Sequence, residues 1–166
     1  MPHPRTLALD VGDRRIGIAI TDLLGLTAQP LFTLHRVGGK SGLRADLKSI
    51  GRFIRQHDVK IVLIGHPLHA DGTPSPQALK SQAFAQSLAE LLTPTHPDLT
   101  IQLFDERLTT RDAHALLDQS GHAPRSSGHA SRLDRKNIID QVAATLLLQS
   151  FLSAQSPALL PDPDTP

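Results

Sequence analysis

The sequence predicts an α/β domain in which a mixed five-stranded sheet carries helices on both faces, with the elements in the order βββαβαβα. Two observations lead to this prediction. Apolar and polar residues alternate in three successive segments before residue 38, which is typical of a meander of strands. Segments with helical spacing then alternate with short apolar runs, which is typical of helices packed on a sheet.

Three of the strands are expected near the N-terminus. Residues 6–22, TLALDVGDRRIGIAITD, predict two strands joined by a turn at 12–14, because bulky apolar residues occupy alternate positions on each side of that turn. Residues 29–37 predict a third strand that ends before two glycines. The runs KIVLIG at 60–65 and TIQLF at 100–104 predict the last two strands, and the first run is apolar throughout, as in a strand buried on both faces.

The first two helices are expected over residues 42–57 and 76–92. In the first, one stripe of residues is apolar, and a second stripe is formed by four basic residues, Arg44, Lys48, Arg52 and Arg55. The second begins with a serine N-cap and a proline at its first position. Its core-facing residues are expected to be Leu79, Ala83, Leu88 and Leu91.

The C-terminal third of the chain predicts a short helix over 109–119, a basic loop over 120–136 and a last helix over about 137–152. Four prolines among the final fourteen residues predict a disordered tail over 153–166. No internal repeat is present, so we expect a single domain over residues 1–152.

The composition excludes several classes of protein. The chain has 166 residues and no cysteine, so it has no disulfide framework and no thiolate metal site. No apolar run approaches the length of a membrane span, and the N-terminus lacks a secretory signal, which together predict a cytoplasmic protein with no membrane partner. The 17 Lys and Arg nearly balance the 16 Asp and Glu, but basic residues cluster within 36–60 and 121–136 and indicate anion-binding surfaces.

Several carboxylates are expected to meet at one end of the sheet. Asp10 lies within the first strand, Asp105 and Glu106 end the last strand, and Asp140 lies near the start of the final helix. If the first, fourth and fifth strands are parallel neighbours, their ends bring these residues together, where α/β sheets usually place their sites. Carboxylate oxygens are ligands that Mg²⁺ prefers, and two such ions can clamp a phosphodiester. The pattern therefore predicts a metal-dependent nuclease, with basic residues nearby for the nucleic-acid backbone.

Each carboxylate taken alone also has a structural interpretation. Asp10 fits an Asp-x-Gly turn, and Glu106 fits a surface ion pair with Arg107 or Arg111. Asp140 fits a negative charge at a helix N-terminus, where the helix dipole favours it. These alternatives stay open on residue patterns alone.

Four segments resemble the YqgF family, described both as Holliday junction resolvases and as pre-16S rRNA nucleases. They occur in the family's order, and DERLTT together with the N-terminal D-x-G-x-x-R-x-G pattern is quite specific. The segments are LALDVGDRRIGIAITD (7–22), VLIGHPLHADGT (62–73), DERLTTRDAHALL (105–117) and IDQVAATLLLQSFL (139–152). The resemblance implies an RNase H-like fold and a hydrolase that cleaves phosphodiester bonds with Mg²⁺ or Mn²⁺.

The resemblance also implies roles for individual residues. Its three catalytic and metal-binding carboxylates are Asp10, Glu106 and Asp140. Arg14, Arg107 and Lys136 match basic positions near the family's site and are candidates for contacts to substrate phosphates; Arg132, in the basic segment 121–136, and Arg52, in the basic helix stripe, are further candidates. The chain departs from the family pattern at His66 and His69, which either approach a phosphate or are tolerated loop substitutions.

Three functions are compared. The first is a nuclease that matures the 5′ end of pre-16S rRNA, with structured RNA and ribosome-assembly intermediates as partners, acting as a monomer or weak dimer. The second is a resolvase of branched DNA, and the third is a non-catalytic nucleic-acid-binding or regulatory module with the same fold. A nucleotide-binding ATPase of the actin and sugar-kinase type shares the first D-x-G hairpin, but it needs a second domain and a second glycine-rich loop that this chain lacks.

Overall fold

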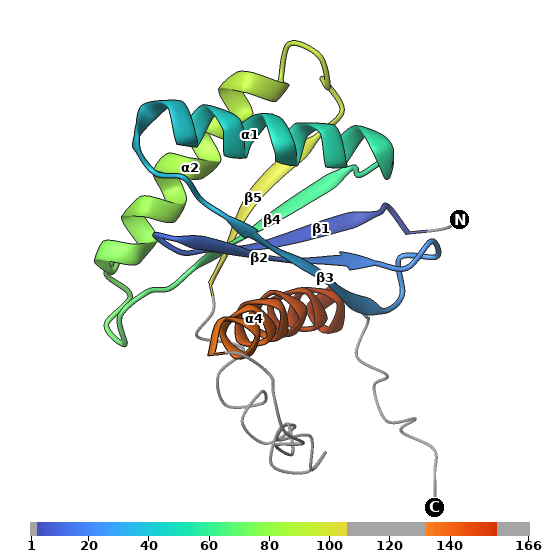
Figure 1. Cartoon of the computed structure of the whole chain (residues 1–166). Coiled ribbons are helices and arrows are strands. Elements are labelled where there is room, and N and C mark those ends of the chain that lie inside the picture. The colour runs from blue at the N-terminus through green and yellow to red at the C-terminus, as the bar shows by residue number, and fades with distance from the viewer. Residues whose placement is uncertain (1–2, 106–131, 156–166) are drawn as a thin grey trace, which may run out of the picture.

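The computed structural model describes residues 3–105 and 132–155 and shows one five-stranded sheet with helices on both faces (Figure 1). The strand order is β3-β2-β1-β4-β5, and the bounds of the strands are β1 Thr6–Val11, β2 Arg15–Thr21, β3 Ala28–His35, β4 Ile61–His66 and β5 Thr100–Asp105. The first three strands form an antiparallel meander, whereas β1, β4 and β5 are parallel neighbours. The predicted mixed sheet is therefore confirmed.

Two helices cover one face of the sheet and a third covers the other (Figure 1). Helices α1 Gly39–Gln56 and α2 Pro76–Leu92 lie on the first face, and α4 Arg132–Gln155 lies on the second. Successive strand residues point to opposite faces, so the alternation along β1 and β2 assigns each side chain to a layer.

The two faces differ in the size of the residues they bury. Bulky residues of β1 and β2 pack toward α1 and α2 in one core cluster, which includes Leu7, Leu9, Val11, Ile16, Ile18 and Ile20. On the other face, Ala8, Ala19 and Leu63 pack against Leu147 and Leu148 of α4. Small strand residues let a helix approach the sheet closely, and this governs the position of α4.

The prediction for the inward face of α2 is wrong in part. Leu79 is 56% exposed and Ala83 is also exposed, whereas Leu88 is buried and Leu91 half-buried. The buried face consists of Ala78, Ser81, Phe84, Leu88 and Leu92. Apolar residues occur all around this helix, so its spacing alone does not define one stripe.

Helix α4 is longer than predicted at both ends. It begins at Arg132, inside the segment predicted to be a loop, and continues to Gln155, three residues into the predicted tail. Residues 132–136 are mostly good helix formers, and a helix needs only one buried stripe rather than an apolar composition.

Some predictions concern residues outside the described ranges. These are the short helix at 109–119, most of the loop at 120–136 and residues 156–166 of the tail. Within the described ranges, no helix is long and apolar enough to cross a membrane.

Candidate functional site

Asp10 lies near the end of β1 and faces the layer that α4 covers. It is half-buried, and its neighbours Leu9 and Val11 point into the opposite core cluster. In the antiparallel pairing with β2, its partner is Gly17. Asp10 is thus part of a strand rather than of the turn that follows it, where the Gly12 amide donates to the Arg15 carbonyl at 2.8 Å.

Gly17 lets the backbone of α4 reach the sheet beside Asp10. A Cβ atom built on Gly17 would lie 2.0 Å from the backbone oxygen of Asp140, so no side chain fits there. Because Gly17 is the register partner of Asp10, this close approach sets Asp140 next to Asp10. Two carboxylates separated by 129 residues of sequence therefore share one site.

Asp140 lies well inside α4 rather than at its start. The helix begins at Arg132, so Asp140 is two turns from the N-terminus, and the dipole of that end no longer explains its charge. Its side chain accepts a hydrogen bond from Nε of Arg15, the first residue of β2, and both side chains are mostly buried. The helix is also tied to the sheet nearby, where the Thr33 hydroxyl donates to the Asn137 carbonyl at 2.9 Å.

The charges of Asp10 and Asp140 favour the binding of a cation between them. Burial, and next the negative charge of Asp140, raise the pKa of Asp10 from its ordinary value of 3.8 to about 6. A carboxylate held in this way gains from a divalent cation at its oxygen atoms. The oxygen atoms of Asp10 and Asp140 are ligands of the type that Mg²⁺ and Mn²⁺ prefer. The described residues alone contain no group of three His, Asp or Glu placed to hold a metal.

The pleat of β5 distinguishes the two acids at its end. Phe104 packs in the cluster beneath α4, and Ile101 packs in the cluster beneath α1 and α2. Alternation then turns Asp105 toward the α2 side, away from Asp10. Asp105 pairs in register with His66 of β4 on that side. Glu106 and Arg107 lie outside the described residues.

Arg36 fastens the hairpin that carries Asp10. Its Nη1 donates to the Gly12 carbonyl at 2.8 Å, and its Nε donates to Oδ2 of the buried Asp46 of α1 at 2.9 Å. The guanidinium also lies 5.5 Å from the ring centroid of Phe84 in α2. The turn is held from a second direction by the ion pair between Lys80 and Asp13, at 2.7 Å.

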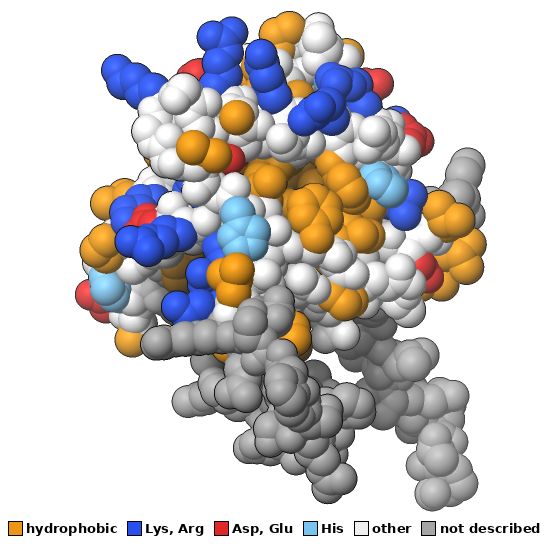
Figure 2. Space-filling model, in the orientation of Figure 1, with side chains coloured by type: hydrophobic (Ala, Val, Ile, Leu, Met, Phe, Trp, Pro, Cys, Tyr) orange, Lys and Arg blue, Asp and Glu red, His pale blue; other side chains and the backbone are white. Residues whose placement is uncertain are grey.

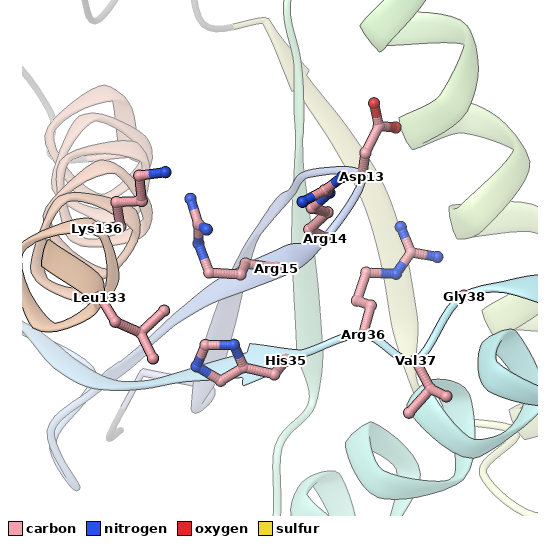
Figure 3. Close-up of a pocket in the computed structure, with 9 residues that line it drawn as sticks. All are labelled: Asp13, Arg14, Arg15, His35, Arg36, Val37, Gly38, Leu133 and Lys136. Atoms are coloured by element: carbon pink, nitrogen blue, oxygen red, sulfur yellow. The ribbon is translucent and has the colours of Figure 1, made fainter.

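A basic pocket of about 700 Å³, drawn in Figure 3, is connected to the carboxylates through Arg15, which lines the pocket and forms an ion pair with Asp140. Its charged and titratable lining consists of Arg14, Arg15, His35, Arg36, Lys136 and Asp13. Figure 3 shows the arginines projecting from the β1–β2 hairpin and from the end of β3, with Lys136 on α4 across from them. The one acid among them is paired with Lys80, so the pocket carries an excess of positive charge.

The structure brings together some of the predicted residues and not others. Asp10 and Asp140 share one site, and Arg14 and Lys136 line the pocket next to it. Arg132 lies in the first turn of α4, but its side chain is outside what the structure describes. Arg52 is exposed on α1, on the other face of the sheet.

The sequence analysis assigns no role to three residues of the site, Arg15, His35 and Arg36, although Arg15 is the arginine of the D-x-G-x-x-R-x-G pattern. The alternation of β2 contained a signal for Arg15, since it shares the parity of Gly17 and hence the face of Asp10. The presence of His35 and Arg36 in the site depends on the sheet order, which places the end of β3 beside the β1–β2 hairpin.

The two histidines that depart from the family pattern lie after β4. His66 ends the strand, and its buried Nε2 has no hydrogen-bond partner among the described residues. His69 closes a turn through its backbone, accepting from the Gly72 amide at 2.9 Å and donating to the Thr73 carbonyl at 2.8 Å. A structural role is thus visible for His69, while His66 stays available for a polar contact.

A family model described as "RuvX: Holliday junction resolvase" matches residues 4–154. The chain belongs to this family. The resemblance to the YqgF family seen in the four sequence segments is thereby confirmed over nearly the whole chain.

Curated relatives of this RuvX chain agree in name and in length. A protein of Myxococcus xanthus is 39% identical over 96% of this chain and 93% of its own length, and one of Syntrophus aciditrophicus is 39% identical over 95% and 93%. A protein of Carboxydothermus hydrogenoformans is 40% identical over 92% of this chain and 98% of its own. Each is named "Putative pre-16S rRNA nuclease".

Solved structures similar to this RuvX protein confirm the RNase H-like fold. RuvC of Thermus thermophilus, in complex with a Holliday junction substrate, superposes with a TM-score of 0.54 at 11% identity, covering 93% of this chain and 98% of that one. The yeast mitochondrial Holliday junction resolvase gives a TM-score of 0.56 at 9% identity, covering 91% and 78%. Likeness at these identities establishes the fold alone.

Proposed function

We propose that this protein is a metal-dependent nuclease that hydrolyses phosphodiester bonds in the maturation of the 5′ end of pre-16S rRNA. The observation that carries the proposal is the contact of α4 with Gly17, which brings Asp140 beside the half-buried Asp10. The basic pocket next to this pair supplies the complementary charge for a nucleic-acid backbone. The names of the curated relatives support the choice of substrate.

Asp10, Asp140 and Glu106 are the proposed catalytic residues and metal ligands. Glu106 follows directly on β5, and two residues before it Phe104 faces α4, so the parity of the strand favours Glu106 over Asp105 as the third carboxylate. When bound, Mg²⁺ or Mn²⁺ supplies an activated water and stabilises the leaving oxygen. The raised pKa of Asp10 fits a carboxylate whose charge is meant to face a cation.

The remaining residues of the site bind and orient. Arg14 and Lys136 contact substrate phosphates from opposite sides of the pocket, and Arg107 and Arg132 are proposed to extend this contact. Arg15 holds the carboxylate of Asp140 toward the sheet. Each phosphate contact adds affinity that falls with salt and carries no sequence information.

The setting of the reaction is part of the same proposal. A nuclease of rRNA precursors works in the cytoplasm, on structured RNA within ribosome-assembly intermediates, and we propose that this chain does so as a monomer or weak dimer. Its near-neutral net charge of +1 concentrates RNA affinity on the local basic surfaces rather than on the whole molecule.

The test is cleavage of two labelled substrates, an rRNA-precursor 5′ leader and a four-way DNA junction, each with Mn²⁺ and with EDTA. The parent should cut the leader only with metal, and Asp10→Asn should lose at least a hundredfold in rate. Asp98→Asn is the matched control, because Asp98 is exposed and precedes β5, at the opposite end of that strand from Glu106. Equal cutting by the parent and Asp10→Asn proteins would refute the mechanism.

The resolvase function is the second candidate, and the description of the matching family favours it. Metal-dependent cutting of the junction, with symmetric nicks, would establish it in place of RNA processing. Binding of both substrates without any cutting would instead support a non-catalytic module with the same fold.

A further inference from the structure

Helix α1 carries an unbalanced row of positive charge. Its cations are Lys40, Arg44, Lys48, Arg52 and Arg55, and all five are exposed. Its one acid, Asp46, is buried and bonded to Arg36, so it neutralises none of them. Among the described residues, no cation of α1 has an ion-pair partner, and Arg52 makes only a 3.4 Å hydrogen bond to Ser49.

These charges oppose the stability of the helix that bears them. Lys40, Arg44, Lys48 and Arg52 follow one another at four-residue spacing, and like charges at that spacing destabilise a helix. Lys40 also lies in the first turn, where the helix dipole disfavours a cation and where α1 has no acid. The neighbouring α2 has a single Lys and a single Glu, so the fold does not require such charge on this face.

The cations border a hollow that a ligand can enter. A groove of about 570 Å³ runs between α1 and the end of α2, lined by Lys48, Arg52 and Arg55 together with Leu91 and Thr95. Figure 2 shows blue side chains along the upper edge of the molecule, over α1, with few red ones among them. The row from Lys40 to Arg55 extends over about 22 Å at 1.5 Å per residue.

The row begins where the basic pocket ends. The pocket is lined by His35, Arg36 and Gly38, and α1 starts at the next residue, Gly39. Positive charge therefore continues from the carboxylate site, past the edge strand β3, onto the opposite face of the sheet. One nucleic acid can follow this route only if it is long enough to leave the cleavage site and pass around that edge.

We propose that α1 is a docking surface for the phosphate backbone of a base-paired segment of the nucleic acid that the protein cleaves. The assignment of that segment to a substrate rests on the function proposed above, but its binding does not require cleavage. The substrate then has two parts, an unpaired one at Asp10 and Asp140 and a helical one on α1.

Two features favour a base-paired occupant over a single strand. The exposed residues of α1 include no aromatic side chain, so unpaired bases would find no stacking partner there. Phe53 of the same helix is turned instead to Phe32, with ring centroids 5.5 Å apart. A rigid row of cations also matches a stiff, regularly spaced backbone, which loses less conformational entropy on binding than a flexible strand.

Binding in EDTA tests this surface without cleavage. The probes are a labelled blunt RNA hairpin and an unstructured RNA of equal length, each titrated over a range of salt. For Lys48→Gln/Arg52→Gln, affinity for the hairpin should fall roughly tenfold or more at low salt, and the slope of log Kd against log salt should fall by about two. Affinity for the unstructured RNA should stay within about twofold of the parent.

The matched control is Lys60→Gln, compared with the single change Arg52→Gln, which removes the same charge. Lys60 already has an acidic partner, Asp58 at 2.8 Å, so this variant should leave hairpin binding nearly unchanged. The exchange Lys48→Arg/Arg52→Lys keeps both charges and should restore the parent slope, which excludes misfolding as the cause.

Other outcomes overturn the proposal. Equal slopes of log Kd against log salt for the parent and the α1 variant would mean that this face is only solvated or binds a protein partner. An equal loss for hairpin and unstructured RNA would mean that α1 binds any strand. Absence of metal-dependent cutting, with the hairpin effect intact, would instead remove the proposed nuclease function and leave the docking surface standing.

Discussion

The two faces of the sheet divide the charges of this protein between them. The α4 face holds the carboxylates Asp10 and Asp140, both mostly buried, and Asp140 contacts Arg15. The α1 face presents a row of exposed cations, and the one acid within α1 is buried. In the basic pocket, Arg15 is paired with Asp140 and Arg36 with Asp46, which reduces the charge left for a ligand. The cations of α1 lie on the other face of the sheet, away from Asp10 and Asp140, and keep their charge available to an anionic ligand.

The two faces also differ in how closely their helices approach. Ala8, Gly17 and Ala19 are small, so α4 reaches the strands almost at backbone contact. The other face buries leucine, isoleucine and valine, so α1 and α2 lie on a thick apolar layer. The close face fixes the position of Asp140 relative to Asp10, and the distant face supports a surface helix.

The largest effect is expected from Gly17→Ala. The new methyl would overlap the Asp140 backbone oxygen, so α4 must move away from the sheet, with an expected loss of about 3 kcal/mol or more in the free energy of unfolding. Cleavage should be lost as well, because Asp140 moves with the helix. Denaturant titration and a cleavage assay measure the two losses.

A control glycine lies on the other face. At Gly51 of α1, an added Cβ would meet only the terminal Cδ2 of the buried Leu92, at 2.9 Å, and the end of a side chain can shift more easily than a backbone atom. Alanine is also favoured over glycine inside a helix by about 1 kcal/mol. Gly51→Ala should leave the free energy of unfolding within about 1 kcal/mol of the parent. Similar losses for both variants would contradict the contrast between a close and a distant face.

The next effect is expected from Asp10→Asn, which should raise the free energy of unfolding in the absence of metal rather than lower it. The raised pKa of Asp10, about 6 in the folded protein against 3.8, means that folding favours its protonated form. Stability is therefore lost as pH rises through this range, and at pH 7.5 in EDTA the variant should be about 3 kcal/mol more stable than the parent.

The pH dependence provides the check on that expectation. Below about pH 3 the Asp10 carboxyl is protonated in both the folded and unfolded states, so the advantage of Asp10→Asn should vanish. Mg²⁺ should stabilise the parent and not the variant. A variant less stable than the parent at neutral pH would show that Asp10 is a structural hydrogen-bonding group instead.

The smallest effect is expected on the α1 face, from Lys40→Glu. An acid in the first turn of α1 complements the helix dipole and should raise the free energy of unfolding by a few tenths of a kcal/mol. The same change should weaken binding of the RNA hairpin. Thermal unfolding measures the gain in stability, and the salt titration measures the loss of affinity for the hairpin. A loss of stability would contradict the inference that the row of cations destabilises α1.

The fold was largely predictable because its signals are local. Alternation in residues 6–22 and the apolar run at 60–65 specify β1, β2 and β4 without reference to the rest of the chain. The inward face of α2 was not predictable, since apolar residues surround that helix and only tertiary packing selects Phe84 over Leu79. The start of α4 was missed for a related reason, because a helix with one buried stripe can have a polar first turn.

The site was predictable in identity but not in geometry. The residue pattern and the family resemblance single out Asp10 and Asp140, yet neither indicates that Gly17 makes their contact possible. That role depends on the register of β1 against β2, which pairs Asp10 with Gly17. The pocket residues His35 and Arg36 likewise depend on the order of strands in the sheet, a long-range property.

Arg36 joins the β1–β2 hairpin to α1 through Gly12 and Asp46, and its guanidinium lies over the ring of Phe84 in α2. The span between the carboxylates and the proposed docking helix is therefore rigid. A substrate whose helical part lies on α1 would be cut at a fixed distance from the base of that helix, whatever its sequence. The protein would then set the distance between the cleaved bond and the base-paired segment, and the contacts of Arg36 would keep that distance constant.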